Sequence, residues 1–417
     1  MIWRSVLVVA GVMFALALSA ALLAGPAGSP ETGRDAGDGA ASADAGGDDA
    51  TAHRADAGTD SGGAGGEATA LPQMVGMSLN VYHAKSMKRY HRAIDRVADL
   101  GLNTLQVVTP VFQKHGASKR VSVMVGPGRG PTAQQLIDLL QHAEERGLTT
   151  ILMPQVNFTE PRGNEWRGQI SPPDWGPWWA SYKKIIKRYL AIATLSDVDV
   201  FTVGCELLTT LAPQQNHEQH WHEIIRHCRA QFDGKLTFST TWDTYQRVSF
   251  WDKLDYIGVS GYWDLTAYAT DASSPSRPAI NRRWRAIQKK LFAFSKKHDT
   301  PLLITELGYP SLPWALKDPW NYVNTENVGP DHAAQARGYR AFLRNWAGYI
   351  TPPGQPPQRT PDNGAPAVGG AVFYEWDVYA KPPAKDTGMG IKGKPAYDVL
   401  ARWIKHGRQA LDDTDEH

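Results

Sequence analysis

The stretch VDVFTVGCELL (residues 198–208) is an apolar, β-branched run that is interrupted by a glutamate, Glu206. A second run, PLLITELGY (301–309), has the same character and carries Glu306 near its end. Such runs predict short buried strands. A carboxylate at the end of a buried strand is costly unless it is paired or functional, so these two strands predict a sheet edge that carries chemistry.

Working outward from these runs, similar short runs recur along the chain with helical stretches between them. The helical stretch 131–147 begins with Pro131 and ends with Gly147, which are helix start and stop signals. This alternation is typical of parallel βα units, and eight of them favour a closed barrel over an open sheet. We therefore expect an α/β fold, a (β/α)8 TIM barrel. Its strands are predicted at 74–82, 104–111, 149–156, 198–204, 235–242, 254–262, 301–309 and 370–376.

The first residues do not belong to this pattern. One arginine precedes an apolar run of about twenty residues, which predicts a signal peptide or a retained signal anchor over residues 1–25. Residues 26–72 are rich in Gly, Ala and Asp and predict a disordered linker, so the folded domain is expected at 73–410. The domain would be exported: periplasmic, extracellular or held at the outer face of the cytoplasmic membrane. Any membrane attachment would run through residues 5–24.

Composition excludes several other classes of function. The net charge of +2 and the absence of Lys/Arg runs argue against a nucleic-acid partner, and no GxGxxG or P-loop motif points to a nucleotide. The two cysteines, Cys205 and Cys228, are expected to be free buried thiols rather than a disulfide. Four histidines share one segment, but their spacing favours a solvated helix start over a metal site. We expect no metal and no cofactor. These histidines are His217, His220, His222 and His227.

The two glutamates suit one reaction in particular. Cleavage of a glycosidic bond uses a protonated carboxylic acid and an ionised carboxylate, and two neighbouring carboxyl groups split their pKa values in this way. The alternative is that Glu206 and Glu306 form structural ion pairs with Arg or Lys residues of the barrel. Residue types alone leave both interpretations open.

Longer stretches carry a resemblance to a known family. The segments 101–113, 132–156, 165–193 and 198–208, followed by 254–263 and 301–311, resemble glycoside hydrolase family 113, which are barrel enzymes of the clan that includes many β-mannanases. The resemblance runs in order through residues 74–405. It implies a retaining mechanism with Glu206 as acid/base and Glu306 as nucleophile. The implied substrate is a β-linked, mannan-like polysaccharide or oligosaccharide, acted on by a monomer.

Some positions depart from the family pattern and put the sugar in doubt. Cys205 stands where relatives tend to carry Thr or Asn before the acid/base. The third strand ends in Gln155, Val156 and Asn157 instead of a His-containing segment, and Thr241–Trp242 replaces an Asn–Trp pair. These positions would line the minus subsites, which bind the sugar on the non-reducing side of the bond that is cleaved.

Other residues are weighed as parts of a sugar-binding cleft. An aromatic hydroxyl at Tyr262 would hydrogen-bond the nucleophile, and Trp376 would form the floor under the sugar. Glu375 and Asp377, its neighbours, should point the other way and be structural. The loop after the third strand is expected to form a cleft wall, with one or two of its tryptophans stacking on sugars and the remainder anchoring the loop. It holds Trp166, Arg167 and Gly168, followed by Asp174, Trp175, Trp178 and Trp179. The substrate-binding candidates are Trp166, Arg167, Gln155, Asn157, Trp242, Tyr262, Trp376, Asn80 and Gln113, with His83 as a weaker one.

Two rival functions use the same residues. A non-catalytic, envelope-tethered barrel would bind glycans without cleaving them. A transglycosylase would pass the covalent intermediate to a sugar instead of water.

Overall fold

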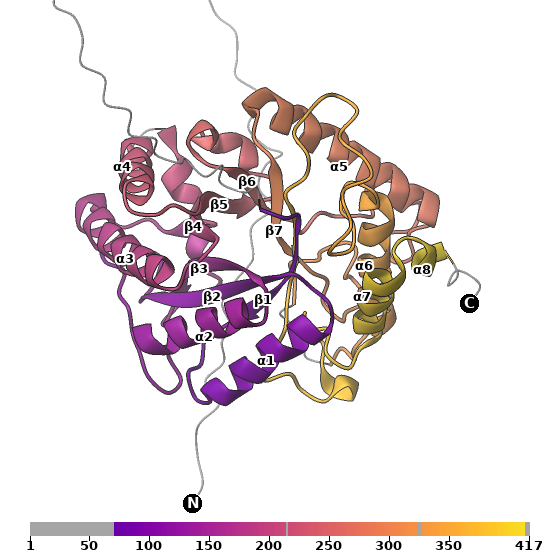
Figure 1. The fold of residues 1–417 in the computed structure, drawn as a ribbon, viewed down its shortest axis with the longest axis horizontal. Coiled ribbons are helices and arrows are strands. Elements are labelled where there is room, and N and C mark those ends of the chain that lie inside the picture. Colours follow the sequence, from indigo (N-terminus) through magenta and orange to yellow (C-terminus); the bar gives the residue numbers. More distant parts are fainter. Residues whose placement is uncertain (1–70, 214–215, 323–326, 413–417) are drawn as a thin grey trace, which may run out of the picture. The chain divides into compact units, whose positions relative to one another are not determined.

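The computed structural model describes residues 71–213, 216–322 and 327–412, and the predicted segment 1–25 and nearly all of 26–72 lie outside this part of the chain. Eight parallel strands close into a barrel in sequence order, β1 to β8, and helices surround the strands (Figure 1). The predicted (β/α)8 barrel is thus confirmed. Within the described ranges, no helix is both long and apolar enough to cross a bilayer.

The strands lie where the apolar runs predicted them, with ends that differ by a few residues. They are β1 Met74–Asn80, β2 Thr104–Gln113, β3 Thr149–Phe158, β4 Val200–Cys205, β5 Lys235–Thr241, β6 Tyr256–Ser260, β7 Leu302–Leu307 and β8 Gly370–Phe373. The helices are α1 Met87–Asp99, α2 Ala133–Glu145, α3 Trp175–Leu195, α4 His217–Arg229, α5 Arg277–His298, α6 His332–Trp346, α7 Pro395–His406 and α8 Gln409–Asp412. The last helix reaches two residues beyond the predicted end of the domain at 410.

Local sequence explains where the helices begin. Thr132 and Gln135 form a reciprocal capping box at the start of α2, so backbone amides that lack helical partners are satisfied. Asp174 caps α3 by accepting from the amide of Gly176 at 2.9 Å. This cap starts α3 at Trp175, inside the segment that the sequence suggested was a loop.

The inside of the barrel is layered. At the amino-terminal end of the strands, Met74, Ile151, Leu303 and Val372 belong to one apolar cluster. Nearer the carboxyl ends the layer is polar, and its members bond to each other across the barrel. Ser239 lies 2.6 Å from Thr305 and 3.2 Å from Ser260 between side-chain oxygens, and Gln106 donates to Ser78 and to the carbonyl of Thr305. This layer adjoins the two strand-end glutamates.

Aromatic side chains fill the space between the barrel and its helices. Trp178, Trp221, Trp284 and Trp403 are fully buried, and many of their neighbours are also aromatic. Most of the tryptophans that are suggestive of sugar stacking therefore serve the core. Both cysteines are free and buried, as the sequence predicted.

Gly370 lies where β8 meets β1 and the barrel closes. Gly370 begins β8 at φ +142°, and a Cβ there would lie 1.9 Å from the carbonyl oxygen of Met74 on β1. We expect Gly370→Ala to lower the free energy of unfolding by about 3 kcal/mol or more, because it combines backbone strain with a clash between strands.

Gly147→Ala is the matched control for Gly370→Ala. Gly147 also has positive φ, +74°, but has nothing within 4 Å of the added Cβ. Its cost should be about 1 kcal/mol. Equal losses in urea denaturation for the two variants would contradict the proposed clash at the β1–β8 seam.

Candidate active site

Two glutamates meet at the carboxyl end of the barrel strands. Glu206 follows β4 directly, and its amide donates to the carbonyl of Ser239 on β5 at 2.8 Å. Glu306 lies on β7 and pairs with Ser260 of β6. The strand register shifts beside both residues, and Glu206 has φ +52°. Irregular, strained backbone of this kind re-aims side chains at functional sites. Both glutamates are almost fully buried, at 2% and 4% exposed.

Arg167 pairs with Glu206 and ties it to β3. Its Nη1 donates to Oε2 of Glu206 at 2.7 Å, while Nη2 donates to Oε1 of Gln155 at 2.9 Å and to Oδ1 of Asn157 at 3.2 Å. Its Nε donates to the carbonyl of Val156 at 3.0 Å. Burial would lower the pKa of Arg167, but the charge of Glu206 more than offsets this and raises the pKa. Four predicted site residues are therefore joined in one network.

Sequence reasoning missed a member of this network, Tyr82. Its hydroxyl donates to Oε1 of Gln155, and Nε2 of Gln155 donates to the sulfur of Cys205 at 3.3 Å. Burial raises the pKa of both Tyr82 and Cys205 well above their ordinary values, so both groups are neutral. The only signal in the sequence was the position of Tyr82 at the end of the first predicted strand.

Glu306 has its own partner. The hydroxyl of Tyr262 donates to Oε2 of Glu306 at 2.8 Å, which is the contact expected for the residue that ends the sixth strand. Trp242 packs edge-on against Tyr262, with ring centroids 6.2 Å apart. Burial and the charge of Glu206 raise the pKa of Glu306 to about 8, while the Tyr262 hydrogen bond and Arg167 oppose this rise. The two carboxyl groups thus interact electrostatically.

Each glutamate leaves one oxygen without a protein partner. Oε2 of Glu206 binds Arg167 and Oε2 of Glu306 binds Tyr262, whereas Oε1 of each is buried and has no hydrogen bond within the described part of the chain. Buried polar atoms are nearly always satisfied, and a catalytic role is one of the reasons why a carboxyl oxygen is left unpaired. Oε2 of each glutamate is thus held by a hydrogen bond, and Oε1 of each is left to react with a substrate.

A third carboxylate corrects an expectation from the sequence. Glu375 does not point away from the site, because β8 ends at Phe373 and strand alternation stops before it. Nδ2 of Asn80 donates to Glu375 and, at 2.7 Å, to the hydroxyl of Tyr374. Burial, then Asp377 and Glu306, raise the pKa of Glu375 to about 8. The predicted residue Asn80 thus binds a carboxylate that senses the charge of Glu306.

Other predicted residues lie in more structural settings. Both ends of the Gln113 amide are used: it donates to the carbonyl of His115 at 2.8 Å and accepts from the indole of Trp178 at 2.9 Å. Trp166 is 5% exposed and its ring lies against Gly168, which leaves little surface for stacking. Trp376 is also 5% exposed, with Tyr397 at its edge.

The expected cleft wall after β3 is instead largely core. Trp178 and Trp179 are buried on α3, and only Trp175 of this group is partly exposed. The reason is that α3 begins at Trp175, so helical periodicity turns the next two tryptophans inward. His83, the weaker candidate, lies edge-on to Tyr379 with ring centroids 6.1 Å apart.

The histidine-rich helix start is not fully solvated, contrary to expectation. His217 is buried and accepts from the indole of Trp179 at 3.1 Å, and burial lowers its pKa to about 4. Lys183 lies 3.0 Å from His220, while His222 and His227 remain partly exposed. Among the residues that the structure describes, no three His, Cys, Asp or Glu side chains are grouped as metal ligands.

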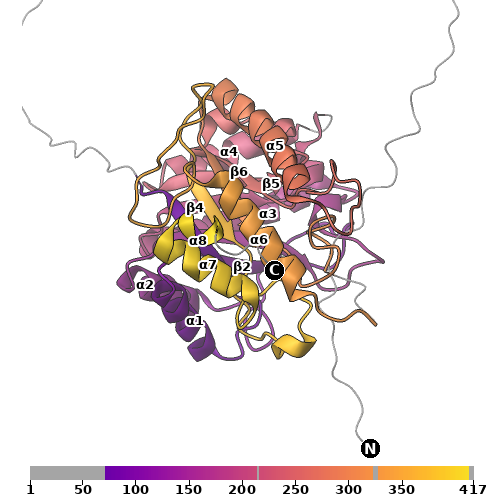
Figure 2. The same cartoon turned by 90° about the vertical axis from the view of Figure 1, so that its right-hand side faces the viewer.

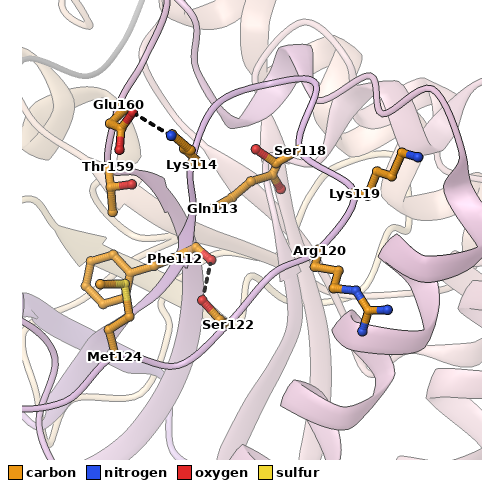
Figure 3. Close-up of a pocket in the computed structure, with 10 residues that line it drawn as sticks. All are labelled: Phe112, Gln113, Lys114, Ser118, Lys119, Arg120, Ser122, Met124, Thr159 and Glu160. Carbon is orange, nitrogen blue, oxygen red and sulfur yellow. Dashed lines mark hydrogen bonds and ion pairs between the residues drawn. The ribbon is translucent and has the colours of Figure 1, made fainter.

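A hollow of about 430 Å³ lies at the carboxyl ends of β2 and β3 (Figure 3). Phe112 and Met124 form its apolar side, and Lys114 pairs with Glu160 at 3.0 Å on its rim. The glutamate pair is not part of its lining.

A family model described as Glycoside Hydrolase Family 113 matches residues 82–349. No curated protein matches the chain. A structure described as a complex of a GH113 β-1,4-mannanase is 22% identical, with a TM-score of 0.65, over 81% of this chain and 100% of its own.

A second similar structure is the GH113 β-mannanase of Alicyclobacillus acidocaldarius in complex with ManMIm. It is 25% identical, with a TM-score of 0.64, over 80% of this chain and 98% of its own.

The raised pKa of Glu306 implies that the free energy of unfolding depends on pH. Its pKa in the folded protein, about 8, exceeds its ordinary value of 4.5, so its stabilising contribution is present below pH 4.5 and is lost as the pH rises to 8. We expect Glu306→Gln to raise the free energy of unfolding by about 1–4 kcal/mol at pH 8 and by little at pH 4.5.

Glu206→Gln is the matched control, because it leaves the buried Arg167 without its counter-charge. Denaturant unfolding should show a loss of about 1–3 kcal/mol at neutral pH. If Glu306→Gln destabilised the protein at pH 8 as much as Glu206→Gln does, the unfavourable burial of Glu306 would be refuted.

Proposed function

This protein belongs to glycoside hydrolase family 113. We propose that it hydrolyses internal bonds of a β-linked, mannan-type polysaccharide with retention of configuration. The observation that carries the proposal is the pair Glu206 and Glu306. Each is anchored through one oxygen, and the second oxygen of each has no hydrogen-bond partner among the residues that the structure describes. The names of the family 113 mannanases described above support the choice of sugar.

The proposed reaction has two displacements. In the first, Glu306 attacks the anomeric carbon through Oε1 while Glu206 gives its proton to the departing glycosidic oxygen, so the bond to the leaving sugar breaks as the ester bond forms. In the second, Glu206 takes a proton from water, whose oxygen displaces Glu306 from the anomeric carbon. Two inversions give net retention.

The environment of the pair controls which glutamate holds the proton. Burial and the charge of Glu206 raise the pKa of Glu306 to about 8, so near neutral pH Glu306 holds a proton in the free protein. The reactive form has the proton on Glu206. Tyr262 favours this form by stabilising ionised Glu306, whereas Arg167 opposes it by stabilising ionised Glu206. We infer that substrate binding between the carboxyl groups loosens the hold of Arg167.

Substrate recognition is assigned to the residues around the pair. Trp242 offers a partly exposed ring beside Tyr262, which suits stacking against a sugar. Gln155 and Asn157 are held by Arg167 at the end of β3. We propose that these side chains, which depart from the family pattern, tune the sugar that binds next to the cleavage point.

We also propose that the protein is exported and acts as a monomer. The apolar run before residue 25 supports export. This places the enzyme where polymeric glycans are met outside the cytoplasm.

Hydrolysis of β-mannan is the direct test. Proton NMR should show the β-anomer of the new reducing end before mutarotation, and products should include several oligosaccharide lengths from the first minutes. The full-length Glu306→Gln variant should be inactive. Binding of mannan by the wild type without cleavage would favour the glycan-binding alternative. Formation of oligosaccharides longer than the starting substrate, at high substrate concentration, would favour the transglycosylase.

Azide separates the roles of the two glutamates. Glu206→Ala and Glu306→Ala should each reduce turnover by several powers of ten, on the order of 10³–10⁵, since each removes a group needed in the transition state. With an activated aryl glycoside, azide should rescue Glu306→Ala to give the inverted α-glycosyl azide. It should rescue Glu206→Ala to give the retained β-glycosyl azide. Exchange of the two products would reverse the assignment.

A further inference from the structure

A second hollow lies on the outer helical layer, away from the strand ends. It has a volume of about 630 Å³ and lies between α5, the end of α6 and the segment 347–363, with Arg408 at one side. Figure 2 shows α5 and α6 together on the side that faces the viewer, outside the barrel. None of the residues in the glutamate network lines this hollow.

The hollow is a long groove. Its lining includes Arg277 near the start of α5 and Ala293 near its end, together with Asn281, Arg285 and Lys289 between them. At 1.5 Å per residue, these sixteen steps span roughly 24 Å along the helix. A single small ion would occupy a fraction of this length, whereas an extended chain of several units would fill it.

The charge of the groove is strongly one-sided. Asp362 is its one acidic lining residue, against Arg277, Arg285, Lys289, Arg344, Arg359 and Arg408. Arg285, Lys289, Arg359 and Arg408 are exposed and form no ion pair within the described part of the chain. Like charges repel along this exposed groove at low ionic strength, and an anionic ligand would relieve the repulsion.

The uncharged lining is largely bonded within the protein. Nε2 of Gln288 donates to the carbonyl of Asn345 at 2.8 Å, and Nδ2 of Asn345 donates to Oδ1 of Asn281 at 2.9 Å. The exposed guanidinium and ammonium groups are therefore what the groove mainly offers to a ligand, and arginine forks suit carboxylates.

Stacking surfaces for nucleobases are missing from the lining. Phe292 and Tyr349 are buried at 7% and 6% exposed, and the guanidinium of Arg359 covers the ring of Tyr349 at 4.7 Å. Single-stranded nucleic acids are bound through such aromatic surfaces. The groove therefore favours a polymer that is held through its carboxylate groups rather than by stacking of its rings.

We propose that this groove is a non-catalytic binding site for a linear polysaccharide that carries carboxylate groups, such as a polyuronate. The site lies outside the barrel mouth and is independent of the proposed reaction. It would hold the enzyme on an acidic glycan matrix while the barrel mouth cleaves a neutral chain.

The test uses the full chain and polygalacturonate as the probe, in affinity electrophoresis and calorimetry at low salt. The triple variant R285Q/K289Q/R359Q should bind polygalacturonate at least tenfold more weakly than the wild type does. The affinity of the double variant R285Q/K289Q should lie between those of the wild type and the triple variant. A control that removes the same charge from exposed residues outside the groove is K290Q/K297Q/K405Q, and it should bind like the wild type. Fully methyl-esterified polygalacturonate, which lacks the charges, should not bind to any of them.

Three outcomes would overturn the proposal. These are equal weakening in the control, absence of binding by the wild type, and displacement of polygalacturonate by DNA at equal charge concentration. Hydrolysis of a short neutral mannooligosaccharide should be unchanged in the triple variant. Since that readout reports only on the barrel mouth, failure of the proposed hydrolase function would be seen separately from failure of the groove.

Discussion

Two buried carboxyl groups that repel each other are the constraint around which the carboxyl end of this barrel is built. Glu206 and Glu306 are nearly inaccessible to water, and the charge of Glu206 raises the free energy of ionising Glu306. The protein offsets this with one cation and one hydroxyl, Arg167 for Glu206 and Tyr262 for Glu306. The compensation is incomplete, and the part that remains is what makes one oxygen of each group reactive.

The hydrogen-bonded layer beneath the pair gives it a firm base. Ser239 links Ser260 and Thr305 through its hydroxyl, and its carbonyl receives the amide of Glu206. Backbone and side-chain atoms of β5 thus connect the strands that carry the two glutamates. This layer lies beneath the two carboxyl groups, whereas Arg167 reaches Glu206 from the short helical turn after β3.

Periodic features of the fold were predictable from sequence, and contacts between distant side chains were not. The eight strands followed from β-branched runs, and the position of Glu206 and Glu306 at one end followed from parallel strand direction. Tyr82 and Glu375 were missed because their significance comes from partners 73 and 295 residues away in the chain. Trp178 and Trp179 were assigned to a loop at the cleft because the helix was expected to start at Ala180, and the cap at Asp174, six residues earlier, was not recognised.

The attachment of Arg167 to a loop rather than to a strand has an evolutionary consequence. The two glutamates are fixed by the barrel, but the cation that biases their proton arrives on a segment that can change length and sequence without disturbing the strands. Changes in this one segment would shift the pH of optimal activity in a descendant protein and leave Glu206 and Glu306 unchanged. Adaptation to acidic or alkaline habitats would then be recorded in the β3–α3 connection before it is recorded anywhere else.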